Sequence, residues 1–219
     1  MNARAQARLV PSTGGVVLEV LVEYPTDGSE RGTIVVCHPH PTQGGTMRHP
    51  ILGAIALRAL AAGFVTVRFN FRGVGESTGA YDDGIGETSD VASITDLVDR
   101  ELPSLAGIAG WSFGAVMALR WQAMSHATVP YVGIAPPVRS ALSPDLPDPG
   151  DLAPARRRFI VGERDQFVDV DALEAYAEEI GADLSVYTGS DHFFVFKHER
   201  LATEVIGAID VSPGAGRRT

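Results

Sequence analysis

The sequence alternates between short apolar runs of strand length and longer runs with helical spacing. Strand-like runs are expected at 16–23, 32–38, 64–71, 105–111, 129–135, 158–162 and 184–188. Helix-like runs lie between or after them, at 49–63, 86–102, 113–126, 170–181 and 198–209. Strands and helices that take turns predict an α/β fold, with a mostly parallel central sheet and helices on both faces.

The chain length limits how many domains this alternation can build. With 219 residues, there is enough material for one well-buried domain but not for two large ones. We expect a single domain over 1–211 and a flexible C-terminal tail over 212–219. The proline-rich segment 136–157 breaks the alternation and is expected to be an extended surface loop.

Charge and cysteine content restrict the partners and the compartment. The 27 acidic and 18 basic residues give a net charge of −9, which disfavours nucleic acid and anionic membranes as partners. A single cysteine, Cys37, excludes an intramolecular disulfide and fits a reducing compartment. The N-terminus has no apolar core of signal-peptide length, and no apolar run could span a membrane. We therefore expect a cytoplasmic protein; the oligomeric state stays open.

The pattern G-x-S-x-G, which marks a strained strand-to-helix turn that exposes a nucleophilic serine, occurs twice. One match, 110–114, follows a strand-like run and directly precedes a helical one, so Ser112 has the required setting. The other match, 75–79, lies in a loop with no helix expected before about residue 86. Ser112 is therefore the predicted nucleophile. The alternatives are Ser77, or a glycine-rich turn at Ser112 that only packs a helix on a strand.

A serine on such a turn needs a base and an acid, which follow it in the order serine, acid, histidine. His192 comes just after the last expected strand, where its loop can reach the carboxyl edge of the sheet. It is the predicted base. The alternatives are a loop histidine that only binds backbone, and His198, which opens the final helix.

The acid should follow a strand that lies between the serine and the histidine. Asp165 lies three residues after the strand at 158–162 and is the predicted acid. In α/β folds, functional residues commonly follow the carboxyl ends of strands in this way. Asp169 and Asp171 are better explained by capping of the next helix. Glu163 and Asp191 remain weaker candidates.

Acyl transfer also requires backbone donors for the oxyanion, and two are expected. One is the N–H of Phe113, the residue after the nucleophile. The other is the N–H of His40, because both neighbouring residues in the turn are prolines without an N–H. A rival interpretation treats His38 and His40 as an H-x-H metal pair, but no third ligand is evident, so no metal is expected. Cys37 is expected to be a core residue.

With these residues identified, the chain resembles the lidless α/β-hydrolases of the predicted-hydrolase or carboxylesterase type. The shared blocks are HPHPTQGGTM (38–47), RFNFRGVGESTGAYDDGIGE (68–87), GWSFG (110–114), VGERD (161–165) and GSDHFF (189–194). The resemblance extends over about 34–196. It implies an α/β-hydrolase fold without a cap domain, a Ser112–Asp165–His192 triad and a structural role for Ser77.

These residues predict a serine hydrolase that cleaves carboxylic esters or related acyl bonds through an acyl-enzyme, with no cofactor. Its partner would be a small acyl substrate in an open site bounded by segment 136–157, Trp111, Phe193 and Phe194. The same triad would serve a thioesterase or a peptidase. The alternative from another functional class is a non-catalytic binding protein with the same fold.

Overall fold

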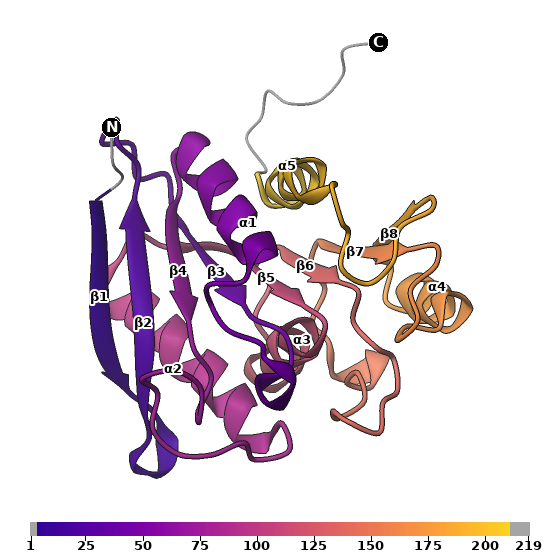
Figure 1. The fold of residues 1–219 in the computed structure, drawn as a ribbon, viewed down its shortest axis with the longest axis horizontal. Coiled ribbons are helices and arrows are strands. Elements are labelled where there is room, and N and C mark those ends of the chain that lie inside the picture. Colours follow the sequence, from indigo (N-terminus) through magenta and orange to yellow (C-terminus); the bar gives the residue numbers. More distant parts are fainter. Residues whose placement is uncertain (1–3, 211–219) are drawn as a thin grey trace.

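The computed structural model describes residues 4–210. They form one eight-stranded sheet in the order β1-β2-β4-β3-β5-β6-β7-β8 (Figure 1). The strands are β1 (Arg4–Pro11), β2 (Val17–Tyr24), β3 (Thr33–Cys37), β4 (Val65–Phe69), β5 (Leu105–Trp111), β6 (Tyr131–Ile134), β7 (Arg157–Gly162) and β8 (Asp183–Tyr187). Strands β3 to β8 are mutually parallel, whereas β2 pairs antiparallel with both β1 and β4.

Helices cover both faces of this sheet. They are α1 (Pro50–Ala61), α2 (Ile85–Glu101), α3 (Phe113–Ser125), α4 (Val170–Glu179) and α5 (His198–Ile209). Helices α1 and α5 pack against each other on one face, and α2 and α3 pack against each other on the opposite face (Figure 1). Because both faces are covered, β3 is buried along its whole length. The predicted α/β class and mostly parallel sheet are confirmed.

The sequence pattern missed the first strand. Strand β1 lies at the edge of the sheet, and Val10 is its only buried residue. An edge strand with so little burial has no apolar alternation to detect, so only seven strands were expected. The expected bounds of β5 and α5 match those observed.

The proline-rich segment between β6 and β7 contains no α-helix. Its only regular element is the short 3-10 turn at Pro149–Asp151, and Leu146 and Pro147 are buried against the body of the protein. Across residues 4–210 no cap domain is inserted. The expected tail at 212–219 lies outside the described residues. None of the helices within 4–210 is long and apolar enough to cross a membrane.

Parallel pairing brings the carboxyl ends of β3, β5, β7 and β8 to the same edge of the sheet. The segments that leave this edge contain His40 after β3, Ser112 after β5, Asp165 after β7 and His192 after β8. The topology therefore gathers all four sequence-predicted segments at one end of the molecule.

Candidate active site

Ser112 occupies the turn between β5 and α3, with φ 54° and ψ −120°. This conformation is sparsely populated by residues other than glycine and is retained only where the surroundings enforce it. The Ser112 N–H donates to the Ile134 carbonyl at 2.7 Å, and the Ser112 carbonyl accepts from the N–H of Ala115 at 2.9 Å. The strand and the helix predicted on either side of Ser112 are confirmed.

The two motif glycines allow this turn to be so tight. A Cβ on Gly110 would collide with the backbone of Gly114, and a Cβ on Gly114 would collide with the carbonyl groups of Cys37 and His38. The second clash shows that the start of α3 lies directly against the end of β3. The glycines therefore place Ser112 beside the turn that contains His40.

The second motif match holds a structural serine. Ser77 is 7% exposed, and its hydroxyl donates to the Asn70 carbonyl at 2.7 Å. The same hydroxyl accepts from the N–H of Glu19 at 2.8 Å. With both hydrogen-bonding functions engaged, Ser77 fastens the loop after β4 to β2, which agrees with the structural role that the family resemblance implies.

The same loop is fixed to α2 by a buried ion pair that the sequence pattern did not reveal. The Arg72 guanidinium donates to both carboxylate oxygens of Asp90, from Nε at 3.0 Å and from Nη2 at 2.8 Å. The side chain of Asp90 is completely buried. Such a bidentate pair holds the loop in one position.

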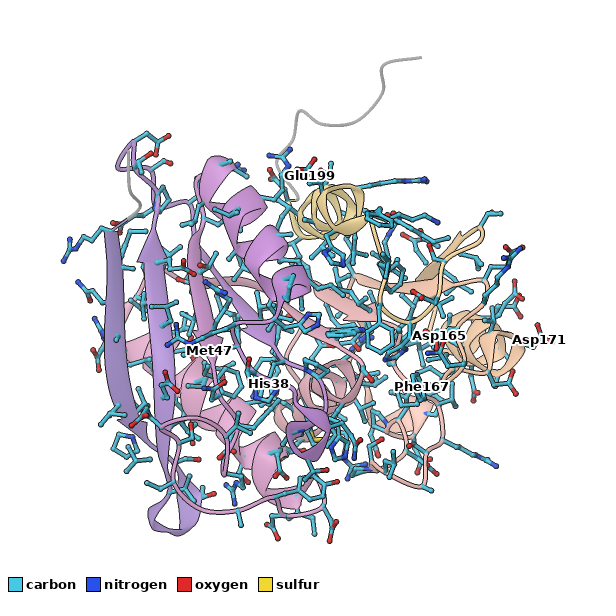
Figure 2. The ribbon with its side chains drawn as sticks, in the orientation of Figure 1. His38, Met47, Asp165, Phe167, Asp171 and Glu199 are labelled. Carbon is cyan, nitrogen blue, oxygen red and sulfur yellow. The ribbon has the colours of Figure 1, made fainter. Side chains whose placement is uncertain are left out.

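Asp165 and His192 come together as the sequence predicted. Asp165 Oδ2 lies 2.8 Å from His192 Nδ1, and the side chains are 0% and 6% exposed, respectively. The other oxygen, Oδ1, accepts from the N–H groups of Phe167 at 2.9 Å and Val168 at 3.1 Å. With Nδ1–H bound to the carboxylate, the imidazole keeps Nε2 available. Figure 2 shows Asp165 and Phe167 close to each other, with Asp171 farther out on α4.

The neighbouring aspartates serve the helix that follows. Asp169 is the N-cap of α4, and its side chain accepts from the N–H of Ala172 at 3.1 Å. The expectation that Asp171 also caps this helix is wrong, because Asp171 lies inside the first turn. A cap must precede the first helical residue, and Asp169 occupies that position.

The remaining sequence candidates have local partners. Glu163 accepts from the N–H of Gly189 at 2.7 Å, and Asp191 accepts from the N–H of Phe193 at 3.0 Å. A ring nitrogen of His198 lies 3.0 Å from the Phe193 carbonyl oxygen. These contacts stabilise the loop that contains His192 rather than compete with Asp165 for its imidazole.

Trp111 contacts the loop that contains His192, a role that the sequence pattern did not reveal. Its indole Nε1–H donates to the His192 carbonyl at 3.2 Å, and the two rings are 5.6 Å apart. The expectation that Phe194 bounds the site is wrong. Phe194 is fully buried, with its ring 5.5 Å from that of Tyr187, so it lines the core and not the open edge of the sheet.

The two residues predicted to supply the oxyanion donors contact each other through their side chains. The rings of His40 and Phe113 are 4.9 Å apart, and both residues are buried. Within residues 4–210, the backbone N–H of neither residue has a hydrogen-bond acceptor. A backbone N–H without an acceptor is costly where water cannot reach it, and an N–H with no internal acceptor is free to bind an anion. That of Phe113 also stands at the N-terminus of α3, where negative charge is favoured.

The nitrogens of the H-x-H pair are already engaged. His38 Nε2 accepts from the N–H of Phe71 at 3.0 Å, which leaves Nδ1–H to donate to the Pro39 carbonyl at 2.6 Å. His40 Nδ1 accepts from the N–H of Thr42 at 3.3 Å, and Nε2 lies 2.6 Å from the Leu142 carbonyl. These rings therefore fix the turn that follows β3. In the part of the chain that the structure describes, no three His, Cys, Asp or Glu residues are arranged to hold a metal ion.

Comparison with known proteins places this chain in a family. XC6422 from Xanthomonas campestris, described as an α/β serine hydrolase without a lid, is 31% identical, with a TM-score of 0.81 and 95% of each chain covered. The chain belongs to the α/β-hydrolase family. A serine hydrolase homologue from Coxiella burnetii is 28% identical, also with a TM-score of 0.81, over 92% of this chain and 96% of that one.

A curated protein is also similar in sequence to this chain. Uncharacterized protein RP471 of Rickettsia prowazekii (strain Madrid E) is 30% identical over 179 residues, which are 78% of this chain and 75% of the relative. No protein-family model matches the sequence.

Two buried groups of this α/β-hydrolase have displaced pKa values that set their roles. Burial raises the pKa of the Cys37 thiol far above its usual range, so the thiol stays protonated and behaves as a core residue, as predicted. Burial lowers the pKa of His38 to about 4, so its imidazole remains neutral and keeps its two hydrogen bonds.

The His38 shift predicts an acid-sensitive fold. Below about pH 6.5 the unfolded chain protonates this histidine while the folded protein does not, so stability falls as the pH drops from about 6.5 to 4. The free energy of unfolding of wild type and His38→Gln should be measured by urea denaturation across that range. The difference between them should shrink by a few kcal/mol (roughly 1.4 per pKa unit) towards pH 4. A difference independent of pH would contradict a neutral buried imidazole.

Proposed function

We propose that this α/β-hydrolase cleaves carboxylic esters or related acyl bonds, with Ser112 as nucleophile, His192 as base and Asp165 as the acid that orients it. One observation carries the proposal. A serine in a strained strand-to-helix turn lies at the same sheet edge as a histidine whose Nδ1 is bound to a fully buried carboxylate. Packing a helix on a strand does not require a strained serine, whereas a strained turn at this position exposes a nucleophile above the sheet.

In the proposed reaction, Ser112 Oγ attacks the acyl carbonyl carbon while His192 Nε2 takes the hydroxyl proton. The tetrahedral intermediate then collapses, the bond to the leaving oxygen breaks, and His192 gives the proton to that oxygen. Water attacks the acyl-enzyme in the same way, with His192 as base, and releases the acid and the free serine. Atoms and charges balance without a cofactor.

Asp165 would act through the imidazole alone. Its Oδ2 accepts the Nδ1–H of His192, which keeps Nε2 directed outward and stabilises the imidazolium that forms when the serine proton is taken. Within residues 4–210, the Ser112 hydroxyl makes no hydrogen bond, to His192 or to any other group. Such contacts are often long in free enzymes and shorten when substrate binds.

The N–H groups of His40 and Phe113 would hold the oxyanion. Both are unpaired within the described residues and come from adjacent segments that are locked together by ring packing and by the close approach at Gly114. Donors fixed in advance stabilise developing charge without reorganisation during the reaction.

The proposed substrate is a small or extended acyl compound. The absence of a cap domain over residues 4–210 leaves the edge of the sheet open, which suits such molecules better than bulk lipid. The acidic net charge and the single cysteine support a cytoplasmic protein that binds neither nucleic acid nor membranes.

A fluorophosphonate probe, which reacts with activated serines, tests the proposal. The probe should label Ser112 alone, as located by peptide mass mapping, and labelling should vanish in Ser112→Ala. Ser77→Ala is the matched control and should still be labelled, because the Ser77 hydroxyl is used in two internal hydrogen bonds. Labelling of Ser77, or labelling that survives in Ser112→Ala, would reject the assignment.

A further inference from the structure

Two exposed phenylalanines flank the His192 imidazole. The rings of Phe167 and Phe193 lie 4.9 Å and 5.6 Å from it, each in an edge-to-face arrangement. Phe167 is 55% exposed and Phe193 is 43% exposed, so each keeps a large apolar surface in water. The two rings come from different loops, one after β7 and one after β8. We call them the phenylalanine pair.

Surface phenylalanines are usually explained by packing, but these rings are only half packed. The backbone of each residue has a structural role, since the Phe167 N–H binds Asp165 and the Phe193 N–H binds Asp191. Those hydrogen bonds require no aromatic side chain. The exposed ring surfaces beside the imidazole therefore call for a different explanation.

The proposed mechanism places one part of the substrate, the leaving group, against that surface. His192 must hand its proton to the leaving oxygen, so the leaving group has to lie within hydrogen-bond reach of Nε2. Whatever is attached to that oxygen then lies next to the rings that flank the imidazole. Resting on the proposed hydrolase function, this geometry assigns Phe167 and Phe193 to the leaving-group side of the substrate.

The acyl side would face a different environment. A cavity of about 400 Å³ adjoins His40, the proposed oxyanion residue, and is lined by Thr42, Tyr81, Asp83 and segment 141–144. The hydroxyl of Ser143 in that segment is buried and has no hydrogen-bond partner within residues 4–210. The lining thus mixes hydroxyl and carboxylate groups with apolar side chains such as those of Leu142 and Pro144, whereas the phenylalanine pair offers only apolar rings.

We propose that the protein prefers esters with a large apolar, preferably aromatic, alcohol and a short acyl group, and that the phenylalanine pair selects the alcohol. The exposed faces and edges of these two rings beside His192 can stack on or meet the edge of an aromatic ring of the substrate, which adds to the gain from apolar burial. In the mixed cavity near His40, a large apolar acyl chain would also cover the Asp83 carboxylate and the hydroxyl groups, and the cost of removing these groups from water offsets part of the gain from apolar burial.

Two isomeric esters test the proposal with the same atoms in reversed order. 2-Phenylethyl acetate has its phenyl group on the alcohol, whereas methyl 3-phenylpropanoate has it on the acyl group; both leaving groups are simple alkanols. The measurement is kcat/KM, which reports the steps up to release of the alcohol. We expect the acetate to be preferred by about tenfold or more.

Three variants test whether the phenylalanine pair causes the preference for the acetate. Phe167→Ala and Phe193→Ala should each reduce the ratio of the two kcat/KM values by about three- to tenfold. Phe196→Ala is the matched control, because this ring is fully exposed and has no ring contact with His192 among the described residues. It should leave the ratio and both rates unchanged. Removal of half-exposed rings should preserve the fold, which a melting curve verifies.

The possible outcomes separate the two proposals. Equal rates for the isomers in wild type, or a preference for the propanoate, would overturn the leaving-group assignment while leaving the hydrolase function intact. An equal fall in both rates in Phe167→Ala or Phe193→Ala would show that the ring only orients His192, and would also overturn it. Failure of wild type to cleave either ester, together with no fluorophosphonate labelling, would reject both proposals.

Discussion

Ser112→Ala is expected to lower kcat by about 10⁶-fold against any substrate that the wild type hydrolyses, which would be the largest effect of any single substitution. The loss follows because no other group can form the acyl-enzyme, and the imidazole then has no hydroxyl to activate. Ester hydrolysis under saturating substrate, measured for both proteins, checks this.

The fold should survive the change. The Ser112 hydroxyl has no hydrogen-bond partner within residues 4–210, and alanine experiences the same backbone strain as serine at φ 54°. The melting temperature of Ser112→Ala should therefore stay close to that of wild type. A variant that keeps its fold and retains more than about one percent of the activity would contradict covalent catalysis by this serine.

Asp165→Asn is expected to lower kcat by up to about 10⁴-fold at neutral pH. The amide oxygen can still accept from the N–H groups of Phe167 and Val168, so the loop should keep its shape. The amide nitrogen then faces His192 Nδ1 and is a donor only. The imidazole must put its proton on Nε2 to accept there, and a protonated Nε2 cannot take the proton of Ser112.

Asp169→Asn is the matched control, four residues along the chain. Its carboxylate caps α4 through the N–H of Ala172, and asparagine caps helices about as well. This variant should keep its activity and melt at nearly the wild-type temperature. If Asp165→Asn were active and a folded Asp169→Asn were inactive, the orienting acid would be Asp169. That result would contradict the catalytic role proposed for the hydrogen bond between Asp165 and His192.

The sequence indicated the fold well where burial leaves a strong pattern. The strands buried on both faces and the helices that cover them were all expected, because their apolar periodicity is long and regular. Strand β1 escaped detection for the opposite reason: it pairs through its backbone at an edge and buries only Val10.

The positions of Ser112, Asp165 and His192 could be predicted because they depend on local order along the chain. Each follows a recognisable strand, and parallel strands deliver their carboxyl ends to one edge. The two G-x-S-x-G matches were also distinguishable locally, since only one stands between a strand and a helix.

Contacts between segments far apart in sequence were decided by the tertiary structure alone. The Trp111 indole donates to the carbonyl of His192, which is 81 positions along the chain. Arg72 forms a buried ion pair with Asp90. Phe194 is fully buried in the core, whereas its neighbour Phe193 is 43% exposed at the surface. Nothing in the local sequence separates two adjacent phenylalanines, because the packing around them determines which one is buried. The sequence by itself determined which strand each candidate catalytic side chain follows, and only the folded sheet decided which groups surround it.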